Sequence, residues 1–600
     1  MADVFLDNHF VGTTKDPVKL VESVVKGRQS QKVPYTINVR HDIKTNSIYI
    51  ETSKGRCIRP LLIVKDGQTL LNEKHLKDLE KNQMSWQDLL QQGLLEYLDA
   101  SEEENALVAL QEQDLSSEHT HLEVAPFDIV GATTGLVPFG NYNHGVRLNQ
   151  GAKNQKHAIG FYAANFYCRM DMDVNLLHYP QKPIVASVLN DILEIDKHPI
   201  GQNVVVAILS NQGYNMEDAI VINQGSVQRG LARSTYFRPL ISEELRYSGG
   251  LIDEICVPDK DVKGYKTEHE YRFLEPDGII YPEAQVAEGD VIIGKTSPPR
   301  FLSALDEYNL STSSRRESSM GLKHGEQGIV DFVCLTENEE GNKLIQVRLR
   351  DQRIPEIGDK FTSRHGQKGV ISLILPEADI PFTVTGVRPD ILFNPHGIPT
   401  RMTVSHLIES LGGKVGALSG RYVDGTIFDS ELEKDLRLEL LQNGFRENGT
   451  EMMYNGVTGE PFNATIYIGN MYYLKLKHMV QNKLHSRARG PIQLLTRQPT
   501  EGRAKEGGLR LGEMEKDTFI AHGASLVLKE RFDSDKTIVP VCENCGLIAI
   551  YDMRNNRSYC PICGENVTIN NVEISYAFKL MLDELKSLTV YPRLQLKGKY

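Results

Sequence analysis

The sequence predicts a multidomain protein of mixed α and β structure, and three observations lead to that class. The chain has 600 residues, which at about 150 residues per domain corresponds to about four domains. Hydrophobic residues make up 40% and charged residues 24% of the sequence, as is typical of folded proteins, so collagen-like and wholly disordered classes are excluded. Strand-like and helix-like stretches also alternate along the chain.

The first hundred or so residues predict a small mixed domain. Residues 35–39 and 47–51 are strand-like, residues 55–64 are basic and apolar, and residues 86–99 form an amphipathic run. An acidic patch follows between residues 101 and 114, where no basic residue occurs. We interpret this patch as a solvent-exposed face. Its acidic members are Glu102, Glu103, Glu104, Glu112 and Asp114.

The middle of the chain predicts a buried strand, a mostly β region and a helix. From residue 203 the stretch NVVVAILS is rich in β-branched residues and runs into the polar segment 211–218, a position where functional residues often lie. Between about residues 235 and 350, Gly and Pro separate short apolar alternations at 290–293, 328–333 and 344–349. Residues 402–411 have apolar residues at helical spacing, and Gly412 and Gly413 are predicted to end that helix.

Four of the eight cysteines form the most specific chemical pattern. Two Cys-x2-Cys pairs are separated by fourteen residues, and a glycine follows the second cysteine of each pair. Such turns direct four thiolates at one Zn²⁺, and four protein ligands leave no open position, so the site is predicted to be structural. Four free thiols are the alternative. The pattern consists of Cys542, Cys545, Cys560 and Cys563. The other four are scattered and indicate free thiols in a reducing compartment.

A local cationic stripe runs from residue 343 to residue 369, with seven basic and three acidic residues in a chain whose net charge is −12. Within it, Lys360 and Lys368 lie eight residues apart in the glycine-flanked segment 358–369, as a loop that approaches phosphate oxygens closely would need. An exposed basic loop without this function is the alternative. A Walker P-loop is excluded, because neither this segment nor residues 412–415 has GxxxxGK followed by Ser or Thr.

Two further features suit phosphates and metal ions. Residues 485–516 contain seven basic and four acidic residues among glycines, and arginines in a flexible loop can follow a nucleic-acid backbone. An exposed loop is again the alternative. Glu217 and Asp218 are adjacent carboxylates just past the predicted buried strand, where they could contact a Mg²⁺ held mainly by other ligands. A surface dipeptide without function is the other interpretation.

Taken together, these stretches resemble the second-largest subunit of multisubunit DNA-dependent RNA polymerase in its archaeal and eukaryotic form. The resemblance runs through nearly the whole chain. It rests on GYNMED at 213–218, GDK and GQKG within 358–369, NPHGIPTRMT at 394–403, RARGP at 487–491, LTRQP at 495–499 and GEME at 512–515. The family's subunit is about twice this length, so the resemblance implies the C-terminal half of a split subunit, called B prime in some archaea.

The resemblance implies a multidomain α+β architecture in chain order. Residues 1–131 would form an external domain, and residues 132–233 and 354–485 would form the two parts of a hybrid-binding domain that contains a β-barrel. Residues 234–353 would form a mostly β wall (flap) domain between these two parts. Residues 486–535 would be the anchor and the loop bordering the RNA–DNA hybrid. Residues 536–600 would be a clamp segment with the zinc knuckle.

The resemblance also implies roles for individual residues. Lys360 and Lys368 would contact the RNA 3′ end and nucleotide phosphates, Arg147 and Arg401 would contact the triphosphate, and Glu217 and Asp218 would lie near the second Mg²⁺. The arginines expected to border the hybrid are Arg487, Arg497, Arg503 and Arg510. His157 and Ala125 replace the family's usual glutamine and histidine, and no role is carried to either.

The sequence therefore predicts a core subunit of DNA-directed RNA polymerase that is inactive alone. The Asp-Phe-Asp-Gly-Asp motif that holds the first Mg²⁺ in the largest subunit is absent from this chain. Its expected partners are the N-terminal half of the split subunit, the largest subunit, other core subunits, DNA, RNA and nucleoside triphosphates. Short apolar runs and an N-terminus without a basic n-region predict a cytoplasmic protein. A noncatalytic zinc-containing nucleic-acid-binding scaffold and a stand-alone phosphotransferase are the alternatives.

Overall fold

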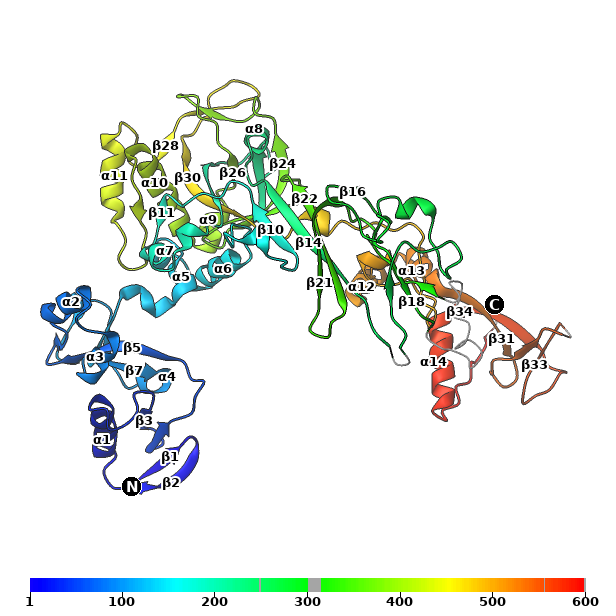
Figure 1. Ribbon diagram of the computed structural model, residues 1–600, viewed down its shortest axis with the longest axis horizontal. Helices are drawn as coiled ribbons and strands as arrows, with labels where there is room; N and C mark the ends of the chain where they lie inside the picture. The colour runs from blue at the N-terminus through cyan, green and yellow to red at the C-terminus, as the bar shows by residue number, and fades with distance from the viewer. Residues whose placement is uncertain (248–249, 300–314, 555, 598–600) are drawn as a thin grey trace. The chain divides into compact units, whose positions relative to one another are not determined.

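The computed structural model describes residues 1–247, 250–299, 315–554 and 556–597 and divides into two compact units (Figure 1). Met1–Arg169, Val174–Tyr236 and Gln352–Val480 form the first unit, and Met170–Asp173, Phe237–Asp351 and Gln481–Tyr600 form the second. Both contain helices and sheets, which confirms the predicted mixed α and β class. None of the helices among the described residues is long and apolar enough to cross a membrane.

The N-terminal part of the first unit is built on two sheets. The first has the order β2-β1-β4-β3 and contacts helix α1 (Pro17–Gln29). Its strands are β1 (Ala2–Leu6), β2 (His9–Thr14), β3 (Asn38–Asp42) and β4 (Ser47–Glu51). The second sheet consists of β5 (Ile58–Lys65), β6 (Gln68–Thr69), β7 (Leu95–Asp99), β8 (Val108–Ala109) and β9 (His121–Glu123). The strand predicted at 47–51 is confirmed, whereas the amphipathic run 86–99 contains helix α3 (Trp86–Gln91) followed by β7.

The acidic patch after residue 101 is not a solvent-exposed face throughout. Glu102, in the short helix α4 (Ala100–Glu103), is only 8% exposed and pairs with Arg28 Nη1 at 2.7 Å. The same guanidinium pairs with Glu96 at 2.8 Å. The interpretation failed for Glu102 because its partner comes from α1, 74 residues earlier, and composition around residue 102 does not reveal that buried cation.

A ring of paired strands forms the centre of the first unit. The sheet order is β12-β26-β13-β24-β23-β30-β28. Because β12 also pairs with β30, the six strands from β12 to β30 in this order form a closed ring of hydrogen-bonded neighbours. The pairs β12–β26 and β13–β24 are parallel, and the other pairs in the ring are antiparallel. The strands are β12 (Gln202–Ile208), β13 (Ala219–Asn223), β23 (Lys360–Ser363), β24 (Lys368–Leu375), β26 (Ile391–Phe393), β28 (Thr450–Glu451) and β30 (Ile466–Lys475).

Alternating side chains of the ring strands enter two different apolar clusters. In β12, Val204 and Val206 pack in the cluster that also contains Phe361. Ala207, and Leu209 directly after the strand, face the other way, into a cluster with Val221. Burial on both faces explains why this strand is a continuous apolar run, and it confirms the strand predicted from residue 203.

Helix α10 (Val404–Ser419) packs against β30 and helix α11 (Glu433–Gln442), as Figure 1 shows. The prediction that Gly412 and Gly413 end this helix is wrong, because the helix continues to a left-handed C-cap at Gly420 (φ 69°). A Cβ at Gly413 would lie 2.2 Å from the backbone oxygen of Asn470 in β30. Gly413 therefore permits close helix–strand packing and does not act as a stop signal.

A buried lysine lies where the ring strands meet the neighbouring chain segments. Lys475, at the end of β30, donates from Nζ to Ala232 O at 3.1 Å, Ser234 Oγ at 3.2 Å and Arg353 O at 3.4 Å. Burial lowers the pKa of this ammonium group to about 8, because charge is disfavoured away from water. The three neutral acceptors satisfy its three donors.

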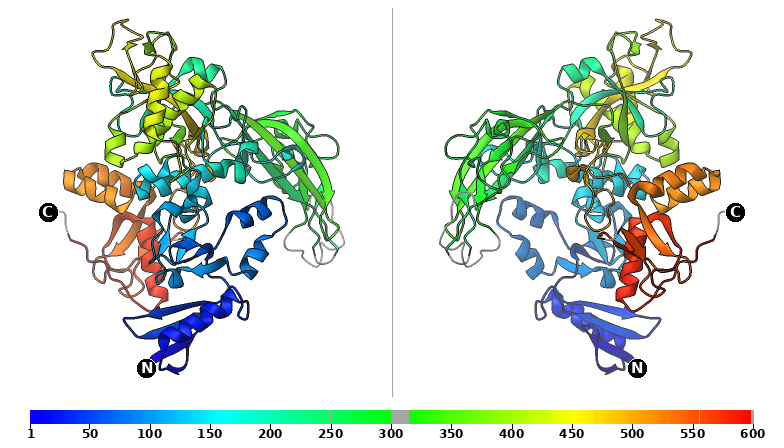
Figure 2. Two further views of the ribbon diagram at one scale, coloured as in Figure 1. Left: turned by 90° about the vertical axis from the view of Figure 1, so that its left-hand side faces the viewer. Right: turned by 90° about the vertical axis from the view of Figure 1, so that its right-hand side faces the viewer.

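The second unit is dominated by long strands and ends in a cysteine-containing segment. Strands β21 (Gly328–Glu337) and β22 (Lys343–Arg353) pair as an antiparallel hairpin among the curved green strands in Figure 2. They contain the strands predicted at 328–333 and 344–349. Their core includes Ile292, Val330 and Ile345. The remaining elements of this unit include α12 (Glu513–His522), α13 (Ser525–Phe532), β31 (Lys536–Cys542), β32 (Ile550–Asp552), β33 (Arg557–Tyr559), β34 (Ile569–Ser575) and α14 (Tyr576–Ser587).

Candidate nucleotide and nucleic-acid binding sites

The two lysines of the glycine-flanked segment lie on one hairpin of the ring. Lys360 begins β23 and Lys368 begins β24, and in the antiparallel register Lys368 lies opposite Thr362. Because side chains alternate along a strand, Lys360 and Lys368 share a face of the hairpin as diagonal neighbours. Lys368 is exposed and Lys360 is half-buried, and neither is paired with a carboxylate among the described residues.

The turn of this hairpin packs tightly against helix α6 (Gly145–Lys156), which carries Arg147. A Cβ at Gly366, whose φ is 73°, would lie 2.7 Å from Arg147 O, and a Cβ at Gly151 would lie 2.2 Å from Arg364 O. Both glycines are therefore required for this approach. As a result, Arg147 Nη1 donates to the Gly366 carbonyl at 3.2 Å.

Arg401 reaches the same turn from helix α9 (Gly397–Arg401). Its Nη1 donates to Gln367 Oε1 at 2.6 Å, and its Nη2 forms an ion pair with Asp218 Oδ1. Asp218 is placed beside the turn by its backbone, since Val370 N donates to Asp218 O at 2.8 Å. The turn thus brings together Arg147, Arg401, Lys368 and Asp218.

Glu217 and Asp218 end a loop that a buried asparagine holds in place. Asn215 is fully buried, accepts from Asn211 N at 2.9 Å and donates to Leu209 O at 2.7 Å. Glu217 has a left-handed backbone with φ 56° and an exposed side chain. Both carboxylates can therefore be reached from solvent. Asn215 was missed by sequence reasoning, although it lies inside the GYNMED string.

A buried ion network supports the turn from behind. Glu409 of α10 pairs with Arg364 Nη2 at 2.6 Å and with His365 Nε2, and it also accepts from Tyr472 N at 3.1 Å. Burial alone would raise the pKa of Glu409, but the adjacent Arg364 and His365 outweigh this effect and lower it to about 2. The residues between Lys360 and Lys368 are thus fixed to the helix behind them. Glu409 is a second supporting residue that the sequence did not reveal.

The four arginines expected to border a hybrid lie in the second unit, and three of them make internal contacts. Arg487 donates from Nη2 to Pro491 O at 3.0 Å, and Arg503 Nη1 donates to Gln481 O at 2.8 Å. The Arg497 guanidinium lies 4.1 Å from the centre of the Tyr576 ring, a cation–π contact. Arg510 is exposed. Three of these side chains therefore make contacts within the second unit.

The four cysteines of the two Cys-x2-Cys pairs converge in the second unit. Their Sγ atoms all lie within 4.8 Å of one another, and those of Cys545 and Cys560 are 3.3 Å apart. Gly546 (φ 73°) and Gly564 (φ 83°) provide the left-handed residue that closes each turn. The backbone N–H of Cys563 lowers the pKa of the Cys560 thiol to about 7, because it stabilises the thiolate. The cluster could hold one metal ion.

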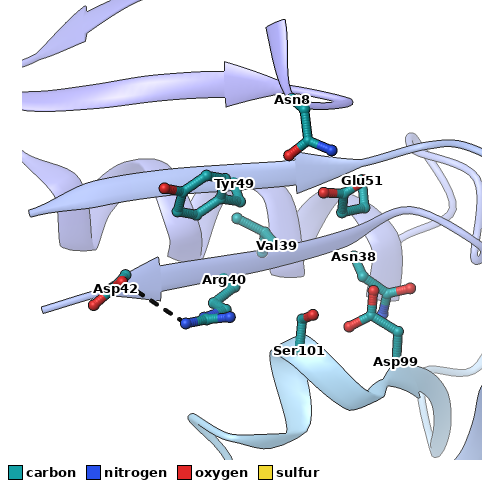
Figure 3. A pocket seen from close by; sticks show the side chains of 9 residues that line it. All are labelled: Asn8, Asn38, Val39, Arg40, Asp42, Tyr49, Glu51, Asp99 and Ser101. Carbon is teal, nitrogen blue, oxygen red and sulfur yellow. Dashed lines mark ion pairs between the residues drawn. The ribbon is translucent and has the colours of Figure 1, made fainter. Parts of the chain in front are cut away.

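A separate cavity of about 260 Å³ lies in the N-terminal part of the first unit (Figure 3). Polar side chains of two sheet strands and of the segment around Asp99 surround it, and Figure 3 shows Arg40 and Asp42 paired at one end. Asp99 at the other end is held by Arg56 at 2.6 Å. None of the proposed phosphate-binding or metal-binding residues lines this cavity.

Comparison with known proteins gives matches along the chain. The family described as RNA polymerase Rpb2, domain 6, matches residues 133–505, and domain 7 of the same protein matches residues 507–597. Domains 4 and 5 match residues 4–65 and 86–128. These four matches follow one another in chain order.

Whole-chain relatives agree with these matches. The chain is 46% identical to DNA-directed RNA polymerase subunit Rpo2 of Saccharolobus solfataricus, over 99% of this chain and 53% of that protein. It is 44% identical to Rpo2 of Sulfolobus acidocaldarius and 40% identical to DNA-directed RNA polymerase II subunit RPB2 of Encephalitozoon cuniculi, with the same two coverages. The chain thus spans about half the length of the curated relatives it matches.

Proposed function

Because this chain belongs to the family of second-largest subunits of DNA-directed RNA polymerase, we propose that it serves as a core subunit of that enzyme and contributes cations to its active centre. The observation that carries this proposal is the turn between β23 and β24. It gathers Lys368, Arg147 and Arg401 beside Asp218, with Lys360 on the same hairpin face. Cations at this density suit the triphosphate of an incoming nucleotide.

In this function the cations would act on charge that moves during nucleotide addition. Attack of the RNA 3′ hydroxyl on the α-phosphate releases pyrophosphate, and negative charge builds up on the transferring and leaving oxygens. Lys368 and the two guanidinium groups would stabilise that charge, and hydrogen bonds to the turn direct both guanidinium groups before the substrate arrives. Lys360 would contact the 3′ end of the transcript.

The residues also fit the metal ions that such a reaction needs. The exposed carboxylates of Glu217 and Asp218 are oxygen ligands of the kind that Mg²⁺ prefers. A Mg²⁺ bound there would neutralise phosphate oxygens. The largest subunit would supply the other Mg²⁺ ligands. In the second unit the four converging thiols suit a structural Zn²⁺, which would hold the clamp segment together.

Further assignments follow the family's architecture. The closed ring of strands supports a β-barrel within the hybrid-binding domain, and the long β21–β22 hairpin would belong to the wall. Arg487, Arg497, Arg503 and Arg510 would border the RNA–DNA hybrid, and α14 would pack against the largest subunit. The proposed partners are the largest subunit, the N-terminal part of the second-largest subunit, other core subunits, DNA template, RNA transcript and nucleoside triphosphates.

Reconstitution tests this function. The chain is mixed with the remaining polymerase subunits, and extension of an RNA primer on a DNA template is measured with and without the chain. We expect extension only in the complete mixture and none by the chain alone. Nucleic-acid binding by the chain without any contribution to extension would instead support the noncatalytic scaffold.

A further inference from the structure

Each of the two arginines near the turn is held by a glutamine amide oxygen. Arg147 Nη1 donates to Gln150 Oε1 at 2.8 Å, one helical turn further along α6. Arg401 Nη1 donates to Gln367 Oε1 at 2.6 Å. The two guanidinium groups therefore share one arrangement, although their helices lie far apart in the sequence.

A neutral acceptor fixes the direction of a guanidinium group without cancelling its charge. Among the described residues, Arg147 donates to Gln150 Oε1 and to Gly366 O, and both acceptors are neutral. Burial lowers the pKa of Arg147, and repulsion from Arg401 lowers it further, because both disfavour the cation. A carboxylate in place of Gln150 would relieve this cost, but it would also reduce the attraction for a phosphate.

The orientation of the Gln367 amide is fixed by its surroundings. Gln367 is 1% exposed, and its other amide atom lies 2.9 Å from Gly397 O and 2.6 Å from Thr403 Oγ1. A carbonyl oxygen only accepts hydrogen bonds, so the atom facing Gly397 must be the donor Nε2. Oε1 is then the atom that faces Arg401. Turning the amide over would place oxygen against the Gly397 carbonyl and N–H groups against Arg401, so both of these hydrogen bonds would be lost.

The carboxylate on the other side of Arg401 is held much less firmly. The Asp218 side chain is 54% exposed, so it can separate from Arg401 Nη2 into solvent or toward a cation. Gln367 is buried and stays in place. When Asp218 separates, Arg401 keeps its direction through Nη1 and presents an uncompensated charge at Nη2.

We propose that Gln150 and Gln367 are positioning residues that aim Arg147 and Arg401 at the triphosphate of a nucleoside triphosphate while leaving the positive charge of both arginines available to it. This inference rests on the proposed function and deepens it. It names two uncharged side chains as determinants of nucleotide affinity and assigns Asp218 as the exchangeable partner of Arg401.

The decisive variant is Gln150→Glu, tested in reconstituted polymerase by measuring the KM for nucleoside triphosphate and the maximal rate. A carboxylate should bind Arg147 at least as strongly as the amide does, so the thermal stability of the chain should stay equal or rise. The KM should nevertheless increase about 10-fold or more, since the guanidinium charge is then neutralised. If Gln150 has only a structural role, the KM of Gln150→Glu should equal that of the wild type as long as the variant is equally stable.

Three further variants complete the experiment. Gln150→Met keeps the size of the side chain but removes the acceptor, and it should also raise the KM because Arg147 loses its direction. Asn149→Asp adds the same charge at the neighbouring exposed position of α6 and should change the KM less than about 2-fold. Gln367→Glu should raise the KM like Gln150→Glu, and zinc content together with thermal stability will report whether the variant chain folds.

The outcomes separate this inference from the proposed function. A wild-type KM for Gln150→Glu, or an equal rise for Asn149→Asp, would overturn the positioning role. Arg147→Ala and Arg401→Ala test the proposed triphosphate-binding site itself. If both leave the KM unchanged in an active enzyme, the arginines do not bind the triphosphate and the proposed site itself is wrong. If they raise the KM and Gln150→Glu does not, only the positioning role fails.

Discussion

Arg364 and Glu409 form an ion pair with 2.6 Å between Nη2 and Oε1, and both side chains are almost completely buried. Arg364 belongs to the turn between the two lysines, and Glu409 belongs to the middle of α10. The pair therefore connects the turn between Lys360 and Lys368 to the helix behind it.

Glu409→Ala should strongly destabilise the first unit. Removal of the carboxylate leaves Arg364 and His365 buried without their partner, which typically costs about 3–5 kcal/mol. Hydrogen exchange of the α10 and β30 amides would measure the loss. Glu433→Ala is the matched control, because its partner Arg437 is on the exposed face of α11 and the expected change is within about 0.5 kcal/mol. Equal effects of the two variants would contradict the role of the buried pair.

His406 should make the first unit sensitive to acid. It is fully buried, its Nε2 has no hydrogen-bond partner among the residues that the structure describes, and it faces His365, Glu409 and Ser363. Burial and His365 lower its pKa to about 3 despite Glu409. Because the folded-state pKa lies below the unfolded value of about 6.5, the stabilising effect is complete above pH 6.5 and is lost as the pH falls toward 3.

The expected loss from His406 is about 1.4 kcal/mol per pH unit below pH 6.5. Unfolding measured between pH 7 and pH 5 in the wild type and in His406→Gln tests it. The difference in stability between the two proteins should shrink as the pH falls. Parallel pH profiles of the two proteins would show that His406 is not the responsible group. Glu409 does not interfere with this test, because its pKa of about 2 lies below the pH range measured.

The four-cysteine cluster should bind about one Zn²⁺ per chain. Cys545→Ser and Cys560→Ser should each lose the metal and unfold the segment between β31 and β34, because the thiolates are what holds its two turns together. Metal analysis and proteolysis of residues 536–570 provide the readouts. Cys57→Ser, at an exposed cysteine outside the cluster, should leave zinc content unchanged.

Lys360→Ala and Lys368→Ala should slow nucleotide addition by about 10²- to 10³-fold in reconstituted polymerase, as is typical when one transition-state donor is removed. Assembly, zinc content and binding of duplex DNA should stay near normal. Lys343→Ala is the control, since Lys343 lies in the same basic stripe but faces Glu244 at 3.6 Å in the second unit. Equal weakening of DNA binding by all three, with no separate rate defect, would favour the scaffold alternative.

Gly413→Ala should destabilise the packing of α10 on β30. The new methyl group would meet the Asn470 backbone oxygen at 2.2 Å, and overpacking of this kind costs about 1–3 kcal/mol. At Gly412 the nearest atoms are side-chain carbons at 3.3 Å and 3.4 Å, and alanine also favours the helix, so Gly412→Ala should be close to neutral. Thermal unfolding of both variants measures the difference. Equal destabilisation by the two alanines would show that the close contact with the Asn470 backbone is not the cause.

Local patterns in the sequence predict the features that depend on local physics. Buried strand β12 follows from its β-branched run, and the four-cysteine cluster follows from two short spacings. Lys360 and Lys368 stand out because cations between glycines are unusual in an acidic chain. In each case the residues that define the feature are close together in the sequence.

Features that depend on distant partners could not be predicted in this way. Gln367 is uncharged, and its side-chain partners Arg401 and Thr403 are more than thirty residues away. The burial of Glu102 can be recognised only once Arg28 is known to lie beside it. The close packing at Gly413 can be recognised only once β30 is known to lie beside α10. The sequence string around residue 367 points to this loop, but only the fold shows that Gln367 is buried and hydrogen-bonded to Arg401.

The three hydrogen bonds of Lys475 have an evolutionary consequence. The chain leaves the neighbourhood of this ammonium group after Ser234 and returns to it at Arg353, so the intervening residues behave as an insertion whose two ends share one anchor. An inserted segment whose two ends lie close together can be lengthened, shortened or exchanged without changing the register of any strand in the ring. A change of length in this segment would then leave the paired strands of the ring and the turn between Lys360 and Lys368 intact.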